Sequence, residues 1–305
     1  MHVQPITPRG YCHGVINAIN IVKKIAKDES LPRPIYILGM LVHNKKIIAD
    51  IEKLGVHTLD DQKKSRLELL DSIEKGTIVF TAHGVSDTVY QKAKEKNLTI
   101  IDTTCKDVTK SQETIKAYLK DGYEILFIGK KRHPESQTVS DYSSRVHIIE
   151  KADDVASLNI ESAKVALTNQ TTMSLYDIHQ IAKVAQKQYP NLKVIEEICD
   201  ATRLRQLAVM QLSEDIEHLF VVGDKRSNNS KKLKEVALTH GTDATLIESL
   251  EDIDLALLKT LNKVSVTSGA STPTKVTKEV IRFLKQFDKN DPTTWDKRSQ
   301  LNNSL

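Results

Sequence analysis

The sequence lacks the features that define several large classes of protein. It has no run of about 18 apolar residues, which predicts no membrane-spanning helix, and its first residues, MHVQPITPRGYC, contain no apolar segment typical of a signal peptide. Aromatic residues make up 5% of the chain, and 44 Lys and Arg against 40 Asp and Glu leave a net charge of only +4. This composition does not indicate a nucleic-acid-binding or membrane protein, but it suits an anionic small molecule or an acidic protein partner.

Cysteine is also scarce, with three residues in 305. An odd number excludes a complete disulfide framework, and the reducing cytoplasm is therefore the expected location. No C-x-x-C pair is present, which excludes zinc ribbons and ferredoxin-like runs.

The three cysteines are almost equally spaced, at Cys12, Cys105 and Cys199. Each follows an apolar run and precedes a segment with helical periodicity; after Cys12, for example, Val15, Ile19 and Val22 share one helix face. This pattern predicts a repeated α/β unit that delivers one thiol per copy.

Two further elements recur in the same order. One is a strand that ends at Gly39, Gly129 or Gly223, and the other is a strand that ends at Thr81, Thr168 or Thr267. The repeat predicts three similar α/β lobes about a pseudo-threefold axis; the alternative is one large α/β domain with scattered cysteines. The expected lobes are residues 13–104, residues 105–198, and residues 1–12 with 199–289, followed by a polar tail at 290–305.

Polar residues follow the predicted strands, where parallel sheets collect functional groups. Three thiols at helix N-termini would hold a soft metal: an iron–sulfur cluster with one open iron, or zinc with a bound water. The alternative is three buried thiols. The donor-rich loop residues suit a diphosphate, although each histidine could instead be a core residue and each Ser or Asn a helix cap. This set comprises His43, His83, His133, Thr171, Thr172, Ser227, Asn229 and Ser271.

Glu135 is a carboxylate within this donor-rich set. Beside a diphosphate it would be unfavourable unless it delivers protons, which is the role we expect. The alternative is a surface carboxylate paired with Lys131 or Arg132.

The segments PRGYCHGV, VHN, TAHGVS, DTTC, HPE, NQTT, CDATRLRQ, SNNS and GASTP occur in one order along nearly the whole chain. In these segments the sequence resembles the 4-hydroxy-3-methylbut-2-enyl diphosphate reductase family (the IspH/LytB family), whose members catalyse the last step of the methylerythritol phosphate route to isoprenoids. The resemblance implies a three-lobed α/β trefoil around a central 4Fe–4S cluster.

The resemblance also implies roles for individual residues. Cys12, Cys105 and Cys199 match the cluster ligands, and Glu135, Thr171 and His133 match the catalytic groups. The diphosphate pocket would comprise His43, His83, His133, Thr171, Thr172, Ser227, Asn228, Asn229 and Ser271. Two positions depart from the common family pattern: Asn228 stands where many members have Ser, and His13 follows Cys12 where a small or aromatic residue is common.

In the implied reaction the substrate hydroxyl binds the fourth iron, two electrons pass through the cluster, and isopentenyl and dimethylallyl diphosphate are formed. Ferredoxin or flavodoxin is the implied electron donor. The alternatives are a non-redox iron–sulfur dehydratase of a phosphorylated substrate, a three-cysteine zinc enzyme, and a non-enzymatic iron–sulfur sensor.

Overall fold

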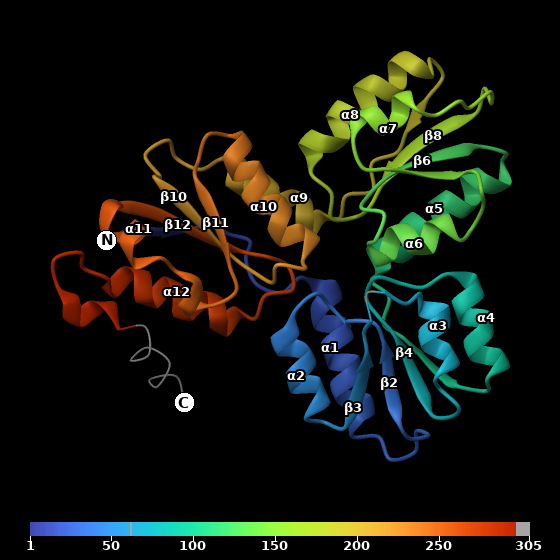
Figure 1. Cartoon of the computed structure of the whole chain (residues 1–305), viewed down its shortest axis with the longest axis horizontal. Helices are drawn as coiled ribbons and strands as arrows, with labels where there is room; N and C mark the ends of the chain where they lie inside the picture. Colours follow the sequence, from blue (N-terminus) through green and yellow to red (C-terminus); the bar gives the residue numbers. More distant parts are fainter. Residues whose placement is uncertain (62, 297–305) are drawn as a thin grey trace. The chain divides into compact units, whose positions relative to one another are not determined.

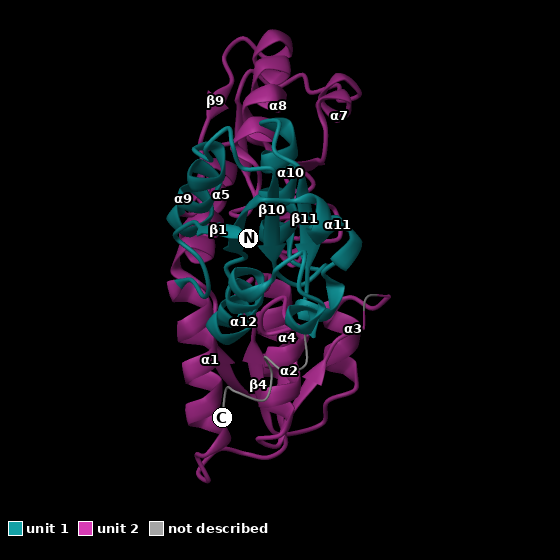
Figure 2. Cartoon of the chain, turned by 90° about the vertical axis from the view of Figure 1, so that its left-hand side faces the viewer, with its two compact units in different colours: residues 1–12, 200–305 teal, residues 13–199 magenta. Residues whose placement is uncertain are grey.

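The computed structural model describes residues 1–61 and 63–296. It divides the chain into two compact units, shown in Figure 2: unit 1 comprises residues 1–12 and 200–305, and unit 2 comprises residues 13–199. Among the described residues there are three parallel sheets of four strands each, with helices between the strands (Figure 1). The predicted α/β class with three similar sheets is confirmed.

Unit 2 holds two of the sheets. In the first, the strands run in the order β3-β2-β4-β5, and its elements are α1 (His13–Ala26), β2 (Ile35–Leu38), α2 (Lys45–Glu52), β3 (Val56–Leu59), α3 (Arg66–Asp71), β4 (Thr77–Phe80), α4 (Asp87–Glu95) and β5 (Thr99–Asp102). In the second, the order is β7-β6-β8-β9, and its elements are α5 (Lys106–Lys120), β6 (Glu124–Ile128), α6 (Pro134–Ser140), β7 (Val146–Ile149), α7 (Ala152–Ala156), β8 (Val165–Asn169), α8 (Leu175–Gln188) and β9 (Lys193–Val194).

Unit 1 holds the third sheet, in which the first strand of the chain pairs in parallel with the last one. The order is β1-β12-β10-β11. The elements are β1 (His2–Pro5), α9 (Asp200–Met210), β10 (His218–Val222), α10 (Asn228–Thr239), β11 (Ala244–Ile247), α11 (Leu255–Thr260), β12 (Lys263–Ser268) and α12 (Thr274–Gln286), with short 3-10 turns at Leu250–Asp252 and Pro292–Trp295.

The three sheets share one strand order. In each sheet, the strand that precedes a cysteine (β5, β9 or β1) lies at one edge. Its neighbour is the strand that ends near the loop threonine (β4, β8 or β12). The next strand is the one that ends at the glycine (β2, β6 or β10). A fourth strand, β3, β7 or β11, completes the other edge; the sequence repeat did not identify it. The boundaries of the three predicted lobes stay a prediction.

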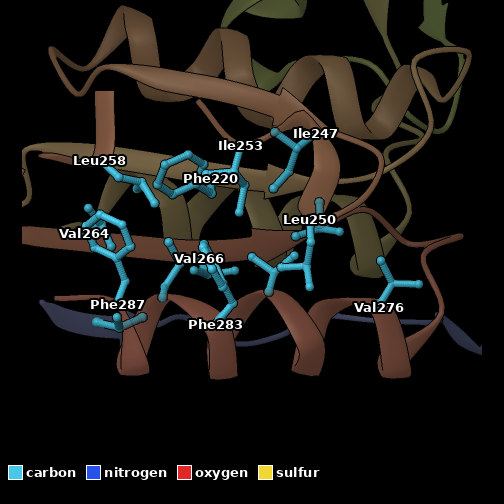
Figure 3. Close-up of a cluster of buried hydrophobic side chains, with 14 residues drawn as sticks. Phe220, Ile247, Leu250, Ile253, Leu258, Val264, Val266, Val276, Phe283 and Phe287 are labelled. Atoms are coloured by element: carbon cyan, nitrogen blue, oxygen red, sulfur yellow. The ribbon is translucent and has the colours of Figure 1, made fainter. Parts of the chain in front are cut away.

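The core of unit 1 shows how the sequence builds these layers (Figure 3). Strand β10 reads HLFVV and is buried at every position, as expected for a parallel strand covered on both faces. Helix α12 packs against the same cluster through Val276, Val280, Phe283 and Leu284, which recur on one helical face. Each fully buried side chain of this kind stabilises the fold by roughly 1.5–3 kcal/mol.

Two of the repeated glycines are required by close packing. A Cβ atom at Gly129 would lie 2.6 Å from Ser136 Oγ, and one at Gly223 would lie 2.2 Å from Ser230 Oγ. These serines lie in α6 and α10, the helices that follow the glycine loops. The glycines therefore allow each helix to begin close to the carboxyl end of its strand, where the candidate residues His133 and Ser227 lie.

The end of the described chain is fixed by local contacts. Trp295 Nε1 donates to the Asp288 carbonyl at 2.8 Å, and Lys259 Nζ lies 3.6 Å from the centre of the Trp295 ring. Residues 297–305 of the predicted polar tail lie outside the described residues. Within the described parts of the chain, no helix is long and apolar enough to cross a membrane.

Candidate active site

Each cysteine is fixed by a backbone hydrogen bond to one of the polar loops. The Cys12 N–H donates to the Ala270 carbonyl at 3.0 Å, the Cys105 N–H donates to the Ala82 carbonyl at 3.0 Å, and the Cys199 N–H donates to the Thr171 carbonyl at 3.2 Å. The first contact lies within unit 1 and the other two within unit 2. Every predicted ligand is thus tied to the loop that carries predicted substrate-binding residues of the same sheet.

The cysteines fit the donor set of a soft metal. All three are half-buried, none forms a disulfide bond, and each immediately precedes the first residue of a helix, α1, α5 or α9. Cysteine sulfur is a ligand that soft metals prefer, so these three side chains fit a soft metal.

Three histidines of unit 2 form one cluster, as their positions after the predicted strands suggest. His43 comes just before α2, His83 lies in the turn after β4, and His133 caps α6. The ring centroids of His43 and His83 are 4.4 Å apart, and each lies 5.4 Å from the His133 ring. His133 is 8% exposed, and the other two are half-buried.

His83 and His133 favour the neutral state. Burial, followed by the neighbouring imidazoles and the Arg66 guanidinium, lowers the pKa of His83 and of His133 well below the ordinary value. His133 Nδ1 accepts a hydrogen bond from the Glu135 N–H at 3.2 Å, so the proton of the neutral ring is on Nε2. His133 Nδ1 also lies 4.0 Å from Glu135 Oε1, but this contact is not an ion pair because the ring is neutral.

Glu135 is buried against Thr171. The Thr171 N–H donates to Glu135 Oε2 at 2.9 Å, and Thr171 Oγ1 lies 3.0 Å from Oε1. Burial raises the pKa of Glu135 to about 7, although both Thr171 contacts act in the opposite direction. The carboxyl is therefore present in both protonation states near neutral pH. It is not the surface carboxylate paired with Lys131 or Arg132 that was the alternative, since it is only 4% exposed.

The neighbouring residues of the same loop fix Thr171 in place. Gln170 donates through Nε2 to Thr172 Oγ1 at 2.8 Å, and its Oε1 accepts from the Lys130 N–H at 3.1 Å. The predicted site residues of unit 2 (His43, His83, His133, Glu135, Thr171 and Thr172) thus come from loops at the carboxyl ends of its two sheets.

The other predicted site residues belong to unit 1. Ser227 caps α10 by accepting from the Ser230 N–H at 3.3 Å, and Asn228 and Asn229 form the first turn of that helix. Ser271 lies in the loop after β12 and is 6% exposed. Among the described residues, neither side-chain amide atom of Asn229 has a hydrogen-bond partner, although the residue is 4% exposed. Such a buried and unsatisfied amide is expected where a ligand completes the hydrogen bonds.

Three residues make contacts that the sequence did not indicate. Arg66 donates to the turn that carries His83, and Arg205 Nη2 donates to the Gly10 carbonyl, two residues before Cys12, at 2.6 Å. His13 Nε2 lies 3.9 Å from Cys105 Sγ and 3.3 Å from Asp107 Oδ2. His13, the unusual residue of the cysteine motif, therefore contacts a second predicted ligand residue.

The candidate residues include thiols suited to a soft metal, neutral hydrogen-bond donors and one protonatable carboxyl. Such a set is typical of a metal-dependent enzyme that acts on an anionic substrate. Comparison with known proteins identifies the family to which the chain belongs. The family model described as LytB protein matches residues 3–285, and the chain belongs to the LytB family.

Its relatives are similar over nearly their whole length. A protein of Geobacillus sp. (strain WCH70), named 4-hydroxy-3-methylbut-2-enyl diphosphate reductase, is 49% identical over 303 residues, which cover 99% of this chain and 96% of that protein. A Bacillus mycoides protein of the same name is 49% identical over 299 residues, covering 97% and 94%.

A solved structure agrees with the fold. The E-1-hydroxy-2-methyl-but-2-enyl-4-diphosphate reductase from Plasmodium falciparum has a TM-score of 0.87 and 31% identity, and the match covers 95% of this chain and 89% of that one. A structure of (E)-4-hydroxy-3-methyl-but-2-enyl diphosphate reductase, with 23% identity and a TM-score of 0.64 over 94% of this chain and all of that one, supports the fold.

Proposed function

We propose that this chain catalyses the reductive dehydroxylation of (E)-4-hydroxy-3-methylbut-2-enyl diphosphate to isopentenyl and dimethylallyl diphosphate, the last step of the methylerythritol phosphate pathway. The observation that carries the proposal is the near-full-length similarity to proteins named for that reductase activity, at 49% identity. The buried Glu135–Thr171 pair and the donor-rich loops supply the chemistry that the reaction needs.

Cys12, Cys105 and Cys199 would hold the cofactor, which we propose to be a 4Fe–4S cluster. When bound with three thiolates, such a cluster supplies electrons and, at the iron without a protein ligand, Lewis acidity. The backbone contacts of the cysteines with Ala270, Ala82 and Thr171 support this assignment, because they couple each ligand to a substrate-binding loop.

The diphosphate would be held by neutral donors. His133 presents an Nε2–H group because its Nδ1 already accepts from the backbone. Asn229 has unsatisfied amide atoms among the described residues, and we assign it, with Ser227, Asn228 and Ser271, to the same ligand. Hydrogen bonds to charged oxygens are worth about 1.5–3 kcal/mol each, so a few of them suffice for firm binding.

Glu135 and Thr171 would deliver the proton that turns the leaving hydroxyl into water. With a pKa of about 7, Glu135 carries a proton in a large fraction of molecules at neutral pH. Its Oε1 lies 3.0 Å from Thr171 Oγ1, so the carboxyl can pass a proton to the Thr171 hydroxyl, which in turn donates to the substrate.

A reductase also needs a source of electrons. We propose ferredoxin or flavodoxin as the partner, and the cytoplasm, where three reduced thiols persist, as the location. Both assignments stay predictions.

The proposed function is tested with anaerobically purified protein. We expect iron and inorganic sulfide in equal amounts, and conversion of the butenyl diphosphate to both five-carbon diphosphates with a reduced viologen dye. Turnover without a reductant would favour a non-redox dehydratase. Absence of sulfide would favour a zinc enzyme, and an intact cluster without product would favour a sensor.

A further inference from the structure

Arg66 is a cationic side chain for which the reaction described above has no role. It is the first residue of α3, and a capping box fixes the start of that helix: the Glu68 N–H donates to Ser65 Oγ, and the Ser65 N–H donates to the Glu68 carboxylate. Leu70, which is fully buried, anchors the same helix in the core of its lobe. The backbone that carries Arg66 is thus held from both sides.

The guanidinium spans the turn that carries His83. Nη1 donates to the Gly84 carbonyl at 2.7 Å, and Nη2 donates to Thr81 Oγ1 at 3.1 Å. The turn is closed by the Gly84 N–H, which donates to the Thr81 carbonyl at 3.0 Å. His83 lies between the two residues that Arg66 contacts, so the position of its ring depends on Arg66.

The same contacts extend to the His83 ring. A guanidinium only donates, so Thr81 Oγ1 accepts from Arg66, and the same hydroxyl lies 3.5 Å from His83 Nδ1. Arg66 therefore fixes a hydroxyl that touches the ring, in addition to the turn that carries it. His133 presents an Nε2–H group, because its Nδ1 accepts from the Glu135 N–H.

Arg66 also provides a positive charge close to the histidine cluster. Burial lowers its pKa to about 10, with the nearby Asp60 acting in the opposite direction, so the side chain stays charged at neutral pH. Gly39, whose φ of +93° favours glycine, lies beside it: a Cβ atom there would make an ordinary contact with Arg66 Nη2, at 3.5 Å.

We infer that Arg66 is a positioning residue for the diphosphate: it holds the Thr81–Gly84 turn, fixes the His83 ring in its place in the cluster, and provides charge to the pocket without touching the ligand. This inference rests on the proposed function, since it assumes that the histidine cluster binds a diphosphate.

The test compares Arg66→Met and Arg66→Lys with the unmodified full-length protein, purified anaerobically. Inorganic diphosphate is the binding probe, and turnover of the butenyl diphosphate with a reduced viologen is followed in parallel. Arg66→Met is expected to weaken diphosphate binding and raise KM by about tenfold or more, with a smaller change in kcat. Arg66→Lys restores the charge without the two-point contact and is expected to recover part of the affinity.

Arg145→Met is the matched control. The Arg145 guanidinium also donates to two groups, the carbonyls of Tyr123 and Leu119, but it lies just before β7, at the amino end of the strands. Both Met variants are expected to lower the melting temperature, whereas only Arg66→Met should lose diphosphate affinity. Histidine labelled with nitrogen-15 adds a direct signature: the imidazole nitrogen signals of His83 should shift in Arg66→Met alone, because the ring loses its fixed surroundings.

The outcomes separate the two proposals. Diphosphate binding within twofold of the unmodified protein in Arg66→Met, or an unchanged His83 signature, would overturn the role of Arg66 and leave the proposed function standing. If the unmodified protein binds no diphosphate and gives no product, the proposed function fails, and the role of Arg66 fails with it.

Discussion

Thr171 contacts the Glu135 carboxylate with both its backbone N–H and its hydroxyl, at 2.9 and 3.0 Å. The carbonyl of the same threonine accepts from the Cys199 N–H at 3.2 Å. One residue therefore joins the candidate proton donor to a candidate metal ligand.

Replacement of Glu135 by Gln is expected to lower kcat by about 10²–10⁴-fold, because a positioned proton donor contributes that much. Gln retains the size of the side chain but cannot supply the proton. Turnover is measured with a reduced viologen, and iron content confirms that the cofactor is retained. Glu124→Gln, a partly buried glutamate whose carboxylate lies 2.7 Å from His147, is the control and should stay active. Near-normal turnover in Glu135→Gln would remove this residue from the mechanism.

The raised pKa of Glu135 predicts a pH-dependent contribution to stability. The unfolded carboxyl titrates near 4.5 and the folded one near 7. The folded state thus binds more protons between these values, and the contribution is fully present below pH 4.5 and is lost as the pH rises through 7. We expect the melting temperature of the unmodified protein to fall relative to that of Glu135→Gln between pH 5 and 8, a window that brackets the pKa of about 7. A constant difference would contradict the shift.

Replacement of Cys105 by Ser is expected to remove or degrade the metal centre, since an alkoxide is a poor substitute for a soft thiolate. Iron and sulfide analysis after anaerobic reconstitution measures the loss. Thr109→Ser, one turn further along α5, serves as the control. An intact four-iron cluster in Cys105→Ser would refute the ligand assignment.

Replacement of Asn229 by Ala should weaken substrate binding without destabilising the fold. In the described structure its buried amide has no hydrogen-bond partner, so its removal relieves a desolvation penalty. We expect KM to rise by about tenfold, from the loss of one hydrogen bond to a charged group, and the melting temperature to stay the same or rise. Asn44→Ala offers the contrast: Asn44 caps α2, and its loss should lower stability by about 1 kcal/mol.

Replacement of Arg205 by Met is expected to destabilise unit 1 by about 1.5–3 kcal/mol, because its charged contact with the Gly10 carbonyl is lost in a buried site. Urea unfolding measures the change. Arg203→Met is the matched control on the same helix: its side chain is exposed and pairs with Asp200. Equal stability of the two variants would show that the Gly10 contact contributes nothing.

The repeat made the fold predictable because each copy consists of short local patterns: a buried strand, a small or polar residue at its end, and a helix. The fourth strand of each sheet was not predicted. Strands β3 (VHTL), β7 (VHII) and β11 (ATLI) are only partly buried edge strands, and no such pattern follows them. The same local patterns predicted that His43, His83 and Glu135 lie in loops that follow strands.

The contacts of Arg66 and Arg205 could not be found in this way. Ser65 and Glu68 form a recognisable capping box, but that pattern predicts only where a helix begins, not what Arg66 contacts. Arg205 lies within the CDATRLRQ segment, yet its partner Gly10 is 195 residues away in the chain. Such contacts depend on the tertiary fold, which no local period encodes.

The parallel pairing of β1 with β12 has a consequence for biosynthesis. A ribosome makes Cys12 before it makes the Ala270 carbonyl that fixes the Cys12 backbone, and before β12, the strand with which β1 pairs. The whole of residues 13–199 emerges in between. Maturation that needs Cys12 in its final surroundings must therefore wait until Ala270 has been synthesised.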